Sequence, residues 1–214
     1  MGTDNFFHKR KAESYERRNA SKPAGKRMLI VCEGSKTEPH YFEEIRQDLR
    51  LQVASVKVCG KECGSDPVSV FKYAQKAYEA EDCAYDTVYC VIDTDSHSNL
   101  NAALAQIKSK GSPYVAIVSS PCFEYWLILH YELHQKAFSA TSKKSIGDVV
   151  GSALRKHDKS YSKGKPGVWA RYKGRLPTAL NNSKIALKTA KKNASINPST
   201  EIHLVVEAMM SLRG

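Results

Sequence analysis

Acidic residues follow two apolar segments of the chain, in a pattern that suits a divalent cation. Glu33 comes directly after the apolar run Met28–Cys32, and Asp93 and Asp95 follow the run 86–92. In an extended segment residues i and i+2 face the same side, so two carboxylates there repel unless a cation neutralises them or one is protonated. Mg²⁺ is usually held by one or two carboxylates with water and phosphate. We therefore expect Glu33, Asp93 and Asp95 to bind Mg²⁺ or Mn²⁺; the alternative is capping or solvated loop acids.

The segment after Glu33 contains a glycine and two further charged residues. Gly34 allows a sharp turn and brings backbone N–H groups near a ligand, and Lys36 is placed to meet a phosphate. The segment is not a Walker A loop, because the second glycine and the Gly-Lys-Ser/Thr ending are missing. Glu38 is either a further metal ligand or a favourable charge at the start of a helix.

A third group of candidates follows an apolar segment that ends near residue 118. Ser120 is predicted to cap a helix and Pro121 to occupy its first turn. Glu124 then falls on a strongly apolar helix, where it needs a metal or a basic partner if it is buried. His130 is a candidate for proton transfer or phosphate contact, with packing as the alternative, and packing is favoured for His134.

The net charge of +11 is unevenly distributed. Residues 1–27 hold eight basic and three acidic side chains, whereas residues 28–135 hold nine basic and fifteen acidic ones. Residues 136–192 hold fifteen basic and only two acidic side chains. Basic flanks around an acidic centre fit a polyanion held against metal-binding carboxylates.

The basic segment 136–192 supplies the predicted contacts to nucleic acid. Cations neutralise phosphates, and the interleaved aromatic residues are expected to stack on bases. No helix resembles a major-groove recognition helix, so contact with the backbone, a single strand or folded RNA is favoured. The candidate residues in this segment are Lys163, Lys165, Arg171, Lys173 and Arg175, with Tyr161, Trp169 and Tyr172 between them.

Periodicity predicts an α/β fold with a parallel sheet of about four strands flanked by helices. The carboxyl ends of parallel strands are where ligands gather, and the acids fall at those ends. The predicted strands are 28–32, 53–58, 86–92 and 114–118, with a last one at 202–206. The predicted helices are 39–51, 67–81 with Asp66 as its N-cap, 99–110, 122–133, 146–156 and 180–192, with a short helix at the end.

The same pattern divides the chain into four parts. Residues 1–26 are predicted to be a flexible basic arm and 27–135 an α/β core. Residues 136–192 form a basic helical insertion or cap, and 193–214 complete the core with a strand and a helix. No apolar run approaches the length that spans a bilayer, and the N-terminus does not read as a signal peptide, which favours the cytoplasm.

Three motifs in combination resemble the RloB-like family. They are Ile-Val-Cys-Glu33-Gly-Ser-Lys-Thr-Glu38-Pro-His-Tyr-Phe, Val-Ile-Asp93-Thr-Asp95, and Ser-Pro121-Cys-Phe-Glu124-Tyr-Trp126 with His130; a late Asn197-Pro-Ser-Thr200 also fits. The resemblance implies a Toprim core, Mg²⁺-dependent phosphodiester chemistry and a role in defence against phage, beside a partner ATPase. By match, Glu33 is the Toprim glutamate and Asp93 and Asp95 are its aspartate pair. The chain departs from the topoisomerase pattern, because residues 96–98 offer no third acid.

Two functions follow as hypotheses. The first is a metal-dependent nuclease that hydrolyses invader nucleic acid, DNA or RNA, or host RNA such as tRNA in abortive infection. The alternative is a non-catalytic subunit that binds nucleic acid or a nucleotide within an ATPase-containing complex. Retention of the three core carboxylates favours the enzyme, and homo-oligomerisation is left open.

Overall fold

The computed structural model describes residues 25–64, 66–95 and 99–213. Nearly all of the expected N-terminal arm, residues 1–24, lies outside the described residues, as does the stretch 96–98. The elements, in chain order, are β1 (Met28–Cys32), α1 (Thr37–Asp48), β2 (Val56–Cys59), α2 (Pro67–Ala80), β3 (Thr87–Asp93), α3 (Leu100–Lys110), β4 (Tyr114–Ser120), α4 (Glu124–Ile128), α5 (Ile146–His157), α6 (Val168–Tyr172), the 3₁₀ turn η1 (Lys173–Arg175), α7 (Leu176–Lys192), β5 (Ser199–Thr200) and α8 (Ile202–Ser211).

The described strands form one sheet in the order β2-β1-β3-β4-β5. The first four are parallel, which confirms the predicted α/β class, and the two-residue β5 adds to the edge in the antiparallel sense. The register pairs Cys32 with Val91 and Asp93 with Ser119, so the carboxyl ends of β1, β3 and β4 lie side by side. The sheet is therefore mostly parallel and five-stranded, and it is compatible with a Toprim-like fold.

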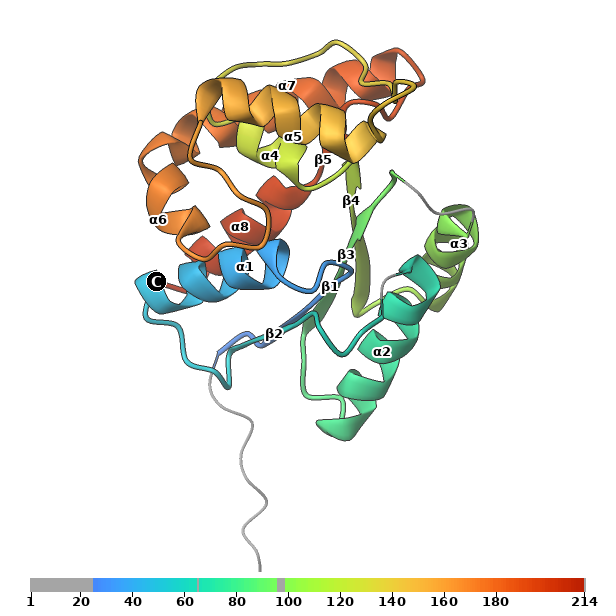
Figure 1. Ribbon diagram of the computed structural model, residues 1–214. Coiled ribbons are helices and arrows are strands. Elements are labelled where there is room, and N and C mark those ends of the chain that lie inside the picture. Colours follow the sequence, from blue (N-terminus) through green and yellow to red (C-terminus); the bar gives the residue numbers. More distant parts are fainter. Residues whose placement is uncertain (1–24, 65, 96–98, 214) are drawn as a thin grey trace, which may run out of the picture.

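Helices cover both faces of this sheet (Figure 1). α2 and α3 lie on one face, and α1, α4 and α8 lie on the other, with α5–α7 stacked beyond them. β1 shows why both faces must be covered: Met28, Ile30 and Cys32 point into one apolar cluster, whereas Leu29 and Val31 point into the other. Successive residues of a strand face opposite sides, so an unbroken apolar run predicts burial on both.

The predicted strand at 202–206 is wrong, because this segment lies in helix α8. Its buried apolar residues Ile202, Val205, Val206 and Met209 are spaced i, i+3, i+4 and i+7, which is the helical period. A short apolar run does not by itself distinguish a strand from a buried helix. The strand that ends the sheet is instead β5, in the preceding Ser-Thr dipeptide.

Predictions for the two caps had different outcomes. Asp66 caps α2 as predicted, since its Oδ1 accepts hydrogen bonds from the N–H groups of Val68 (3.1 Å) and Ser69 (3.2 Å). Ser120 does not cap a helix: it is the last residue of β4, and α4 begins only at Glu124. The predicted helix 122–133 is therefore shortened to one turn and a half, which is buried throughout.

The basic segment packs into the same apolar cluster as the helices next to the sheet. Val150 and Leu154 of α5 and Trp169 and Tyr172 of α6 belong to the cluster that contains Tyr41 of α1. Burial of these side chains ties α5–α7 to the α1 face of the sheet. Among the described residues, no helix combines the length and apolar character needed to cross a membrane.

Candidate metal and phosphate site

The first two predicted ligands meet at the ends of β1 and β3. The N–H of Glu33 donates to the carbonyl of Val91 (3.0 Å), which extends the β1–β3 ladder by one residue. The N–H of Asp93 in turn donates to Glu33 Oε2 (3.2 Å). Sheet register, rather than side-chain attraction, thus brings the two acids together.

An open pocket of about 620 Å³ lies at these strand ends. Its acidic lining is Glu33, Glu38, Asp93 and Asp95, which are the four predicted metal ligands. Three lysines line it as well: Lys36, Lys61 and Lys163. The remaining described lining residues are small or hydroxyl-bearing, namely Gly34, Ser35, Thr37, Gly64 and Gly164. We refer to this cavity as the carboxylate pocket.

Glu38 faces the pocket from the first turn of α1 and is buried, with 6% of its surface exposed. Burial raises its pKa to about 7; the Glu124 and Glu33 carboxylates add to the rise, and backbone hydrogen bonding and Lys163 oppose it. Gly34 makes this position available, because a Cβ at residue 34 would overlap the Glu38 carboxylate. The glycine thus serves a close approach of a side chain, besides the turn predicted for it.

Among the acids of the pocket, Asp93 has the surroundings that most clearly favour a bound positive charge. Its Oδ1 atom is shielded from solvent and has no hydrogen-bond partner among the described residues. Burial of the carboxyl group raises the pKa of Asp93 well above its ordinary value, and the charges of Glu38, Glu124 and Glu33 raise it further. Buried polar groups are normally paired, so an orphaned carboxylate oxygen in an acidic pocket favours a cation as its partner.

Glu124 is buried behind these acids, with 3% of its surface exposed. Its Oε1 accepts a hydrogen bond from the Tyr161 hydroxyl (2.9 Å) and lies 3.6 Å from Lys163 Nζ. The sequence predicts that a buried Glu124 needs a metal or a basic residue of the cap as its partner. The structure supplies a basic residue, Lys163. Desolvation near its Nζ lowers the pKa of Lys163, although 71% of the side chain is exposed; the charges of Glu124 and the acids around it outweigh this and raise the pKa above its usual value.

Lys163 reaches the pocket on a loop, residues 158–167, which we call the strap. The N–H of Gly164 donates to Thr37 Oγ1 (2.9 Å) beside the pocket. Farther along, the N–H of Trp169 donates to Glu44 Oε2 (2.8 Å), which fastens the start of α6 to α1. The strap is therefore held on α1 by Gly164 within it and by Trp169 just beyond its end, and Lys163 lines the pocket from it.

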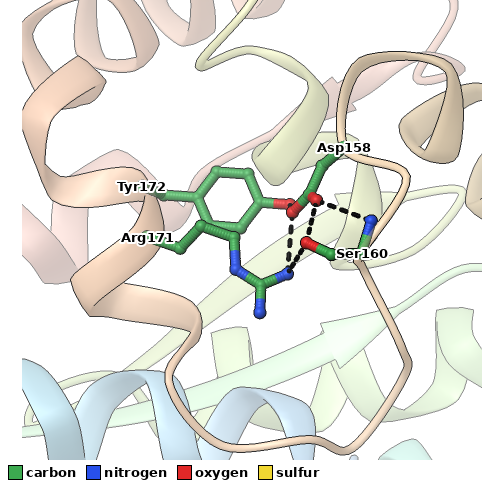
Figure 2. Close-up of polar contacts among 4 residues, drawn as sticks. All are labelled: Asp158, Ser160, Arg171 and Tyr172. Atoms are coloured by element: carbon green, nitrogen blue, oxygen red, sulfur yellow. Dashed lines mark hydrogen bonds and ion pairs between the residues drawn. The ribbon is translucent and has the colours of Figure 1, made fainter.

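The beginning of the strap is fixed by Asp158 (Figure 2). Asp158 Oδ2 accepts hydrogen bonds from Arg171 (2.9 Å) and the Tyr172 hydroxyl (3.0 Å), and Oδ1 accepts from the N–H (3.0 Å) and hydroxyl (2.6 Å) of Ser160. Burial alone would raise the pKa of Asp158, but the hydrogen bonds from Arg171, Ser160 and Tyr172 lower it to about 2.

Not all predicted phosphate contacts lie at the pocket. Arg171 forms an ion pair with Asp158 (2.9 Å), Lys173 forms one with Asp48 (2.7 Å), and Arg175 lies over the ring of Tyr131 at 4.7 Å. Lys165 is exposed on the strap, outside the described lining of the pocket. Lys36 and Lys163 are the two predicted contacts that line it. Lys61 lines it too and was missed, because nothing in the local sequence around it indicates a ligand site.

The aromatic residues of the basic segment are buried, so they are not available for the base stacking that the sequence predicts. Tyr161, Trp169 and Tyr172 are each at most 5% exposed and belong to the apolar core. Trp169 Nε1 donates to Asp48 (3.0 Å), so its polar atom is also engaged within the protein. The alternation of aromatic and basic residues therefore reflects elements that bury their aromatic side chains and expose their basic ones. In the sequence, the many basic residues conceal this amphipathic pattern.

His130 is set apart from the carboxylates. It is 1% exposed and packs edge-on against Trp126 and Tyr172, at ring-centroid distances of 4.9 and 5.3 Å. Burial lowers its pKa to about 4, so the ring is neutral at pH 7. Its Nδ1 lies 3.0 Å from the carbonyl of Trp126, and it does not line the carboxylate pocket. These contacts fit the packing alternative, while the Nε2 atom of the ring is buried without a hydrogen-bond partner among the described residues.

The described residues suit a partly hydrated cation better than a closed cage. No three His, Cys, Asp or Glu side chains in the described part of the chain are close enough to hold a metal ion as they lie. Mg²⁺ commonly keeps several waters and uses only one or two carboxylates, with substrate phosphate completing its shell. Oxygen donors, an orphaned carboxylate oxygen and an open pocket fit that mode of binding. Glu33, Asp93 and Asp95 would hold such an ion, with Glu38 beside them.

Fold and site together define an α/β protein with a mostly parallel sheet, compatible with a Toprim-like fold, and a lysine-lined carboxylate pocket at its strand ends. A family model described as RloB-like protein matches residues 28–209, and the chain belongs to this family. The match spans most of the chain and confirms the family resemblance of the motifs. No curated protein and no solved structure matches the chain.

Proposed function

We propose that this chain is a Mg²⁺- or Mn²⁺-dependent nuclease that hydrolyses phosphodiesters of nucleic acid. The observation that carries the proposal is the carboxylate pocket, where four acids and three lysines share one open cavity at the strand ends. Carboxylates alone would repel a phosphodiester, and lysines alone would bind it without activating it. Together they can hold a cation and the phosphate beside it.

The acids and the lysines that line the pocket have separate roles in this proposal. Glu33, Asp93 and Asp95 hold the cation, which when bound polarises the phosphodiester and steadies the leaving oxygen. Lys36, Lys61 and Lys163 neutralise the phosphate from separate loops. Glu38, with a pKa of about 7, is suited to accept a proton from an attacking water at neutral pH.

The role in anti-phage defence belongs to the same proposal and rests on membership of the RloB-like family. DNA and RNA, including tRNA, are both candidate substrates, and an ATPase is the proposed partner. The cytoplasm is the compartment where such a substrate and partner would be met.

The decisive variant is Asp93→Asn, which keeps the side-chain shape but removes the charge. Full-length protein with Mg²⁺ or Mn²⁺ should cut at least one of plasmid DNA, single-stranded DNA or tRNA, and Asp93→Asn should lose about 10²-fold or more of that rate. Asp82→Asn, a change at an exposed acid after α2, is the matched control and should cut like the wild type. Equal cutting by Asp93→Asn would show that the site is wrong.

A non-catalytic subunit is the second candidate, and one observation favours it: no three metal-type ligands converge among the described residues. In that case the protein binds nucleic acid or a nucleotide but leaves it intact, even when the partner ATPase is added. Gel-shift binding without any cleavage product, in the same reactions, would select this reading over the nuclease.

A further inference from the structure

The carboxylate of Asp95 lies against the first turn of α5, the first helix of the basic segment. A Cβ placed on Gly147 would come within 3.1 Å of Asp95 Oδ2, closer than an ordinary van der Waals contact. The next nearest atom to that position, Ser145 Oγ, is 4.0 Å away. Residue 147 therefore has room for a side chain on every side except the one that Asp95 occupies.

The end of α5 that meets Asp95 is the one that attracts anions. Ser145 caps this helix, accepting a hydrogen bond from the N–H of Asp148 (3.1 Å) and donating its own N–H to Asp148 Oδ2 (3.3 Å). Gly147 is the second residue of the twelve-residue helix, where N–H groups have no partner within the helix. The partial positive charge there stabilises a nearby carboxylate. The contact is thus attractive as well as close.

We propose that Gly147 is a positioning residue for Asp95. Its lack of a side chain lets α5 hold the second acid of the Asp93–Asp95 pair at the wall of the carboxylate pocket. The inference rests on the proposed function, because it takes Asp95 to be a ligand of the cation. It makes the basic segment part of the metal site through a helix contact, in addition to the strap that brings Lys163.

Two glycines in one helix allow a matched test. Gly147→Ala puts a methyl group against Asp95, whereas Gly151→Ala would meet only the flexible side chain of Arg155, at 3.5 Å or more. Both changes replace glycine by a better helix former in α5, so a general effect on the helix is shared. Mn²⁺ affinity of the full-length protein is measured by electron paramagnetic resonance of free Mn²⁺, and folding by melting temperature.

We expect Gly147→Ala to weaken Mn²⁺ binding about tenfold, the usual size for groups that orient metal ligands, and Gly151→Ala to leave it unchanged. The Asp95→Ala background completes a double-mutant cycle: there, Gly147→Ala should have no further effect on Mn²⁺ affinity. If Gly147→Ala instead lowers the melting temperature, Asp95→Ala should restore it, because the clash is gone.

Two results overturn the inference: wild-type Mn²⁺ affinity in Gly147→Ala, or an effect of Gly147→Ala that persists in full without the Asp95 carboxylate. Asp93→Asn separates this failure from failure of the proposed function. If Asp93→Asn loses Mn²⁺ but Gly147→Ala does not, only the role of Gly147 is wrong. If the wild type binds no Mn²⁺, or binds it as well as Asp93→Asn does, the metal site and the inference fall together.

Discussion

Glu38 and Asp93 are carboxyl groups placed where their charges are unfavourable in the metal-free protein. Both have a pKa raised first by burial and then by the neighbouring acids. A fold that keeps such groups stores an unfavourable interaction that a bound cation would relieve. Acids of this kind are more often functional than structural, because a solvated loop would avoid the cost.

This arrangement predicts that the metal-free protein loses stability as pH rises. The pKa of Glu38 is about 7 in the folded protein against a usual 4.5, so the folded form retains a proton that the unfolded chain has released. The contribution is fully present below pH 4.5 and is lost as pH rises through 7. We expect a loss of roughly 3 kcal/mol between pH 5 and pH 8, measured by urea unfolding in EDTA.

Glu38→Gln should lessen this pH dependence, leaving the part that comes from the raised pKa of Asp93, and Glu79→Gln, at an exposed position of α2, should leave it unchanged. Added Mn²⁺ should lessen the fall at pH 8, because a ligand that binds only the folded state stabilises it. A pH dependence that survives Glu38→Gln in full would contradict the assignment.

The sequence allowed the acids of the pocket to be predicted and their surroundings only in part. Glu33, Asp93 and Asp95 stand next to apolar runs, so strand ends alone place them at one edge. Lys61 follows β2 in a short loop, and only the sheet order, with β2 beside β1, brings it to the same edge. Such long-range placement leaves no local pattern in the chain.

At the scale of elements, the strap depends on the group of hydrogen bonds around Asp158. These bonds lower the pKa of Asp158 to about 2, so they stabilise the fold above its usual pKa of 3.8 and the effect is lost as pH falls through 2. Asp158→Asn should therefore cost on the order of 2 kcal/mol at pH 7. Chemical denaturation checks this, with Asp82→Asn as a surface control expected within about 0.5 kcal/mol of the wild type. An unchanged midpoint for Asp158→Asn would show that the network does not anchor the strap.

Elements with a long regular pattern were predictable, and short ones were not. α2, α3 and α5 begin and end within a few residues of the predicted positions, because apolar spacing marks each of them and a side-chain cap marks the start of α2 and of α5. β5 has two residues and no apolar pattern, and it exists because it pairs with Ser119 and Ser120 of β4. The helix α4 is shorter than predicted because a segment that is buried all round carries no period to mark its ends.

At the scale of the molecule, positive charge is concentrated in 136–192, but several of its cations are engaged within the protein. Arg171 and Lys173 pair with acids within the protein. The sequence predicts that Arg171 contacts nucleic acid, but its ion pair with Asp158 makes a structural role the expectation. Its loss should lower stability, since it removes a partner of Asp158. The cations at the carboxylate pocket are those expected to meet a phosphate.

Lys61→Ala and Lys163→Ala should each weaken nucleic-acid binding and reduce the slope of log affinity against log salt by about one. Lys110→Ala, the same change at the far end of α3, is the control and should alter neither quantity. Fluorescence anisotropy between low and moderate salt measures both. Slopes that match the wild type for Lys61→Ala and Lys163→Ala would move the binding surface elsewhere.

The apolar cluster that joins α1 and α4 to α5 and α6 has a consequence for how this chain can vary through evolution. Val150, Leu154 and Tyr172 fill the same interior as Tyr41 and Trp126. The basic segment therefore cannot be exchanged between relatives as a cassette, because a replacement would have to match the existing interior in shape and volume. Its surface lysines are free to drift, whereas its buried side must change together with the helices that carry the acids. New substrate preferences would then arise by exchange of surface residues on a retained frame.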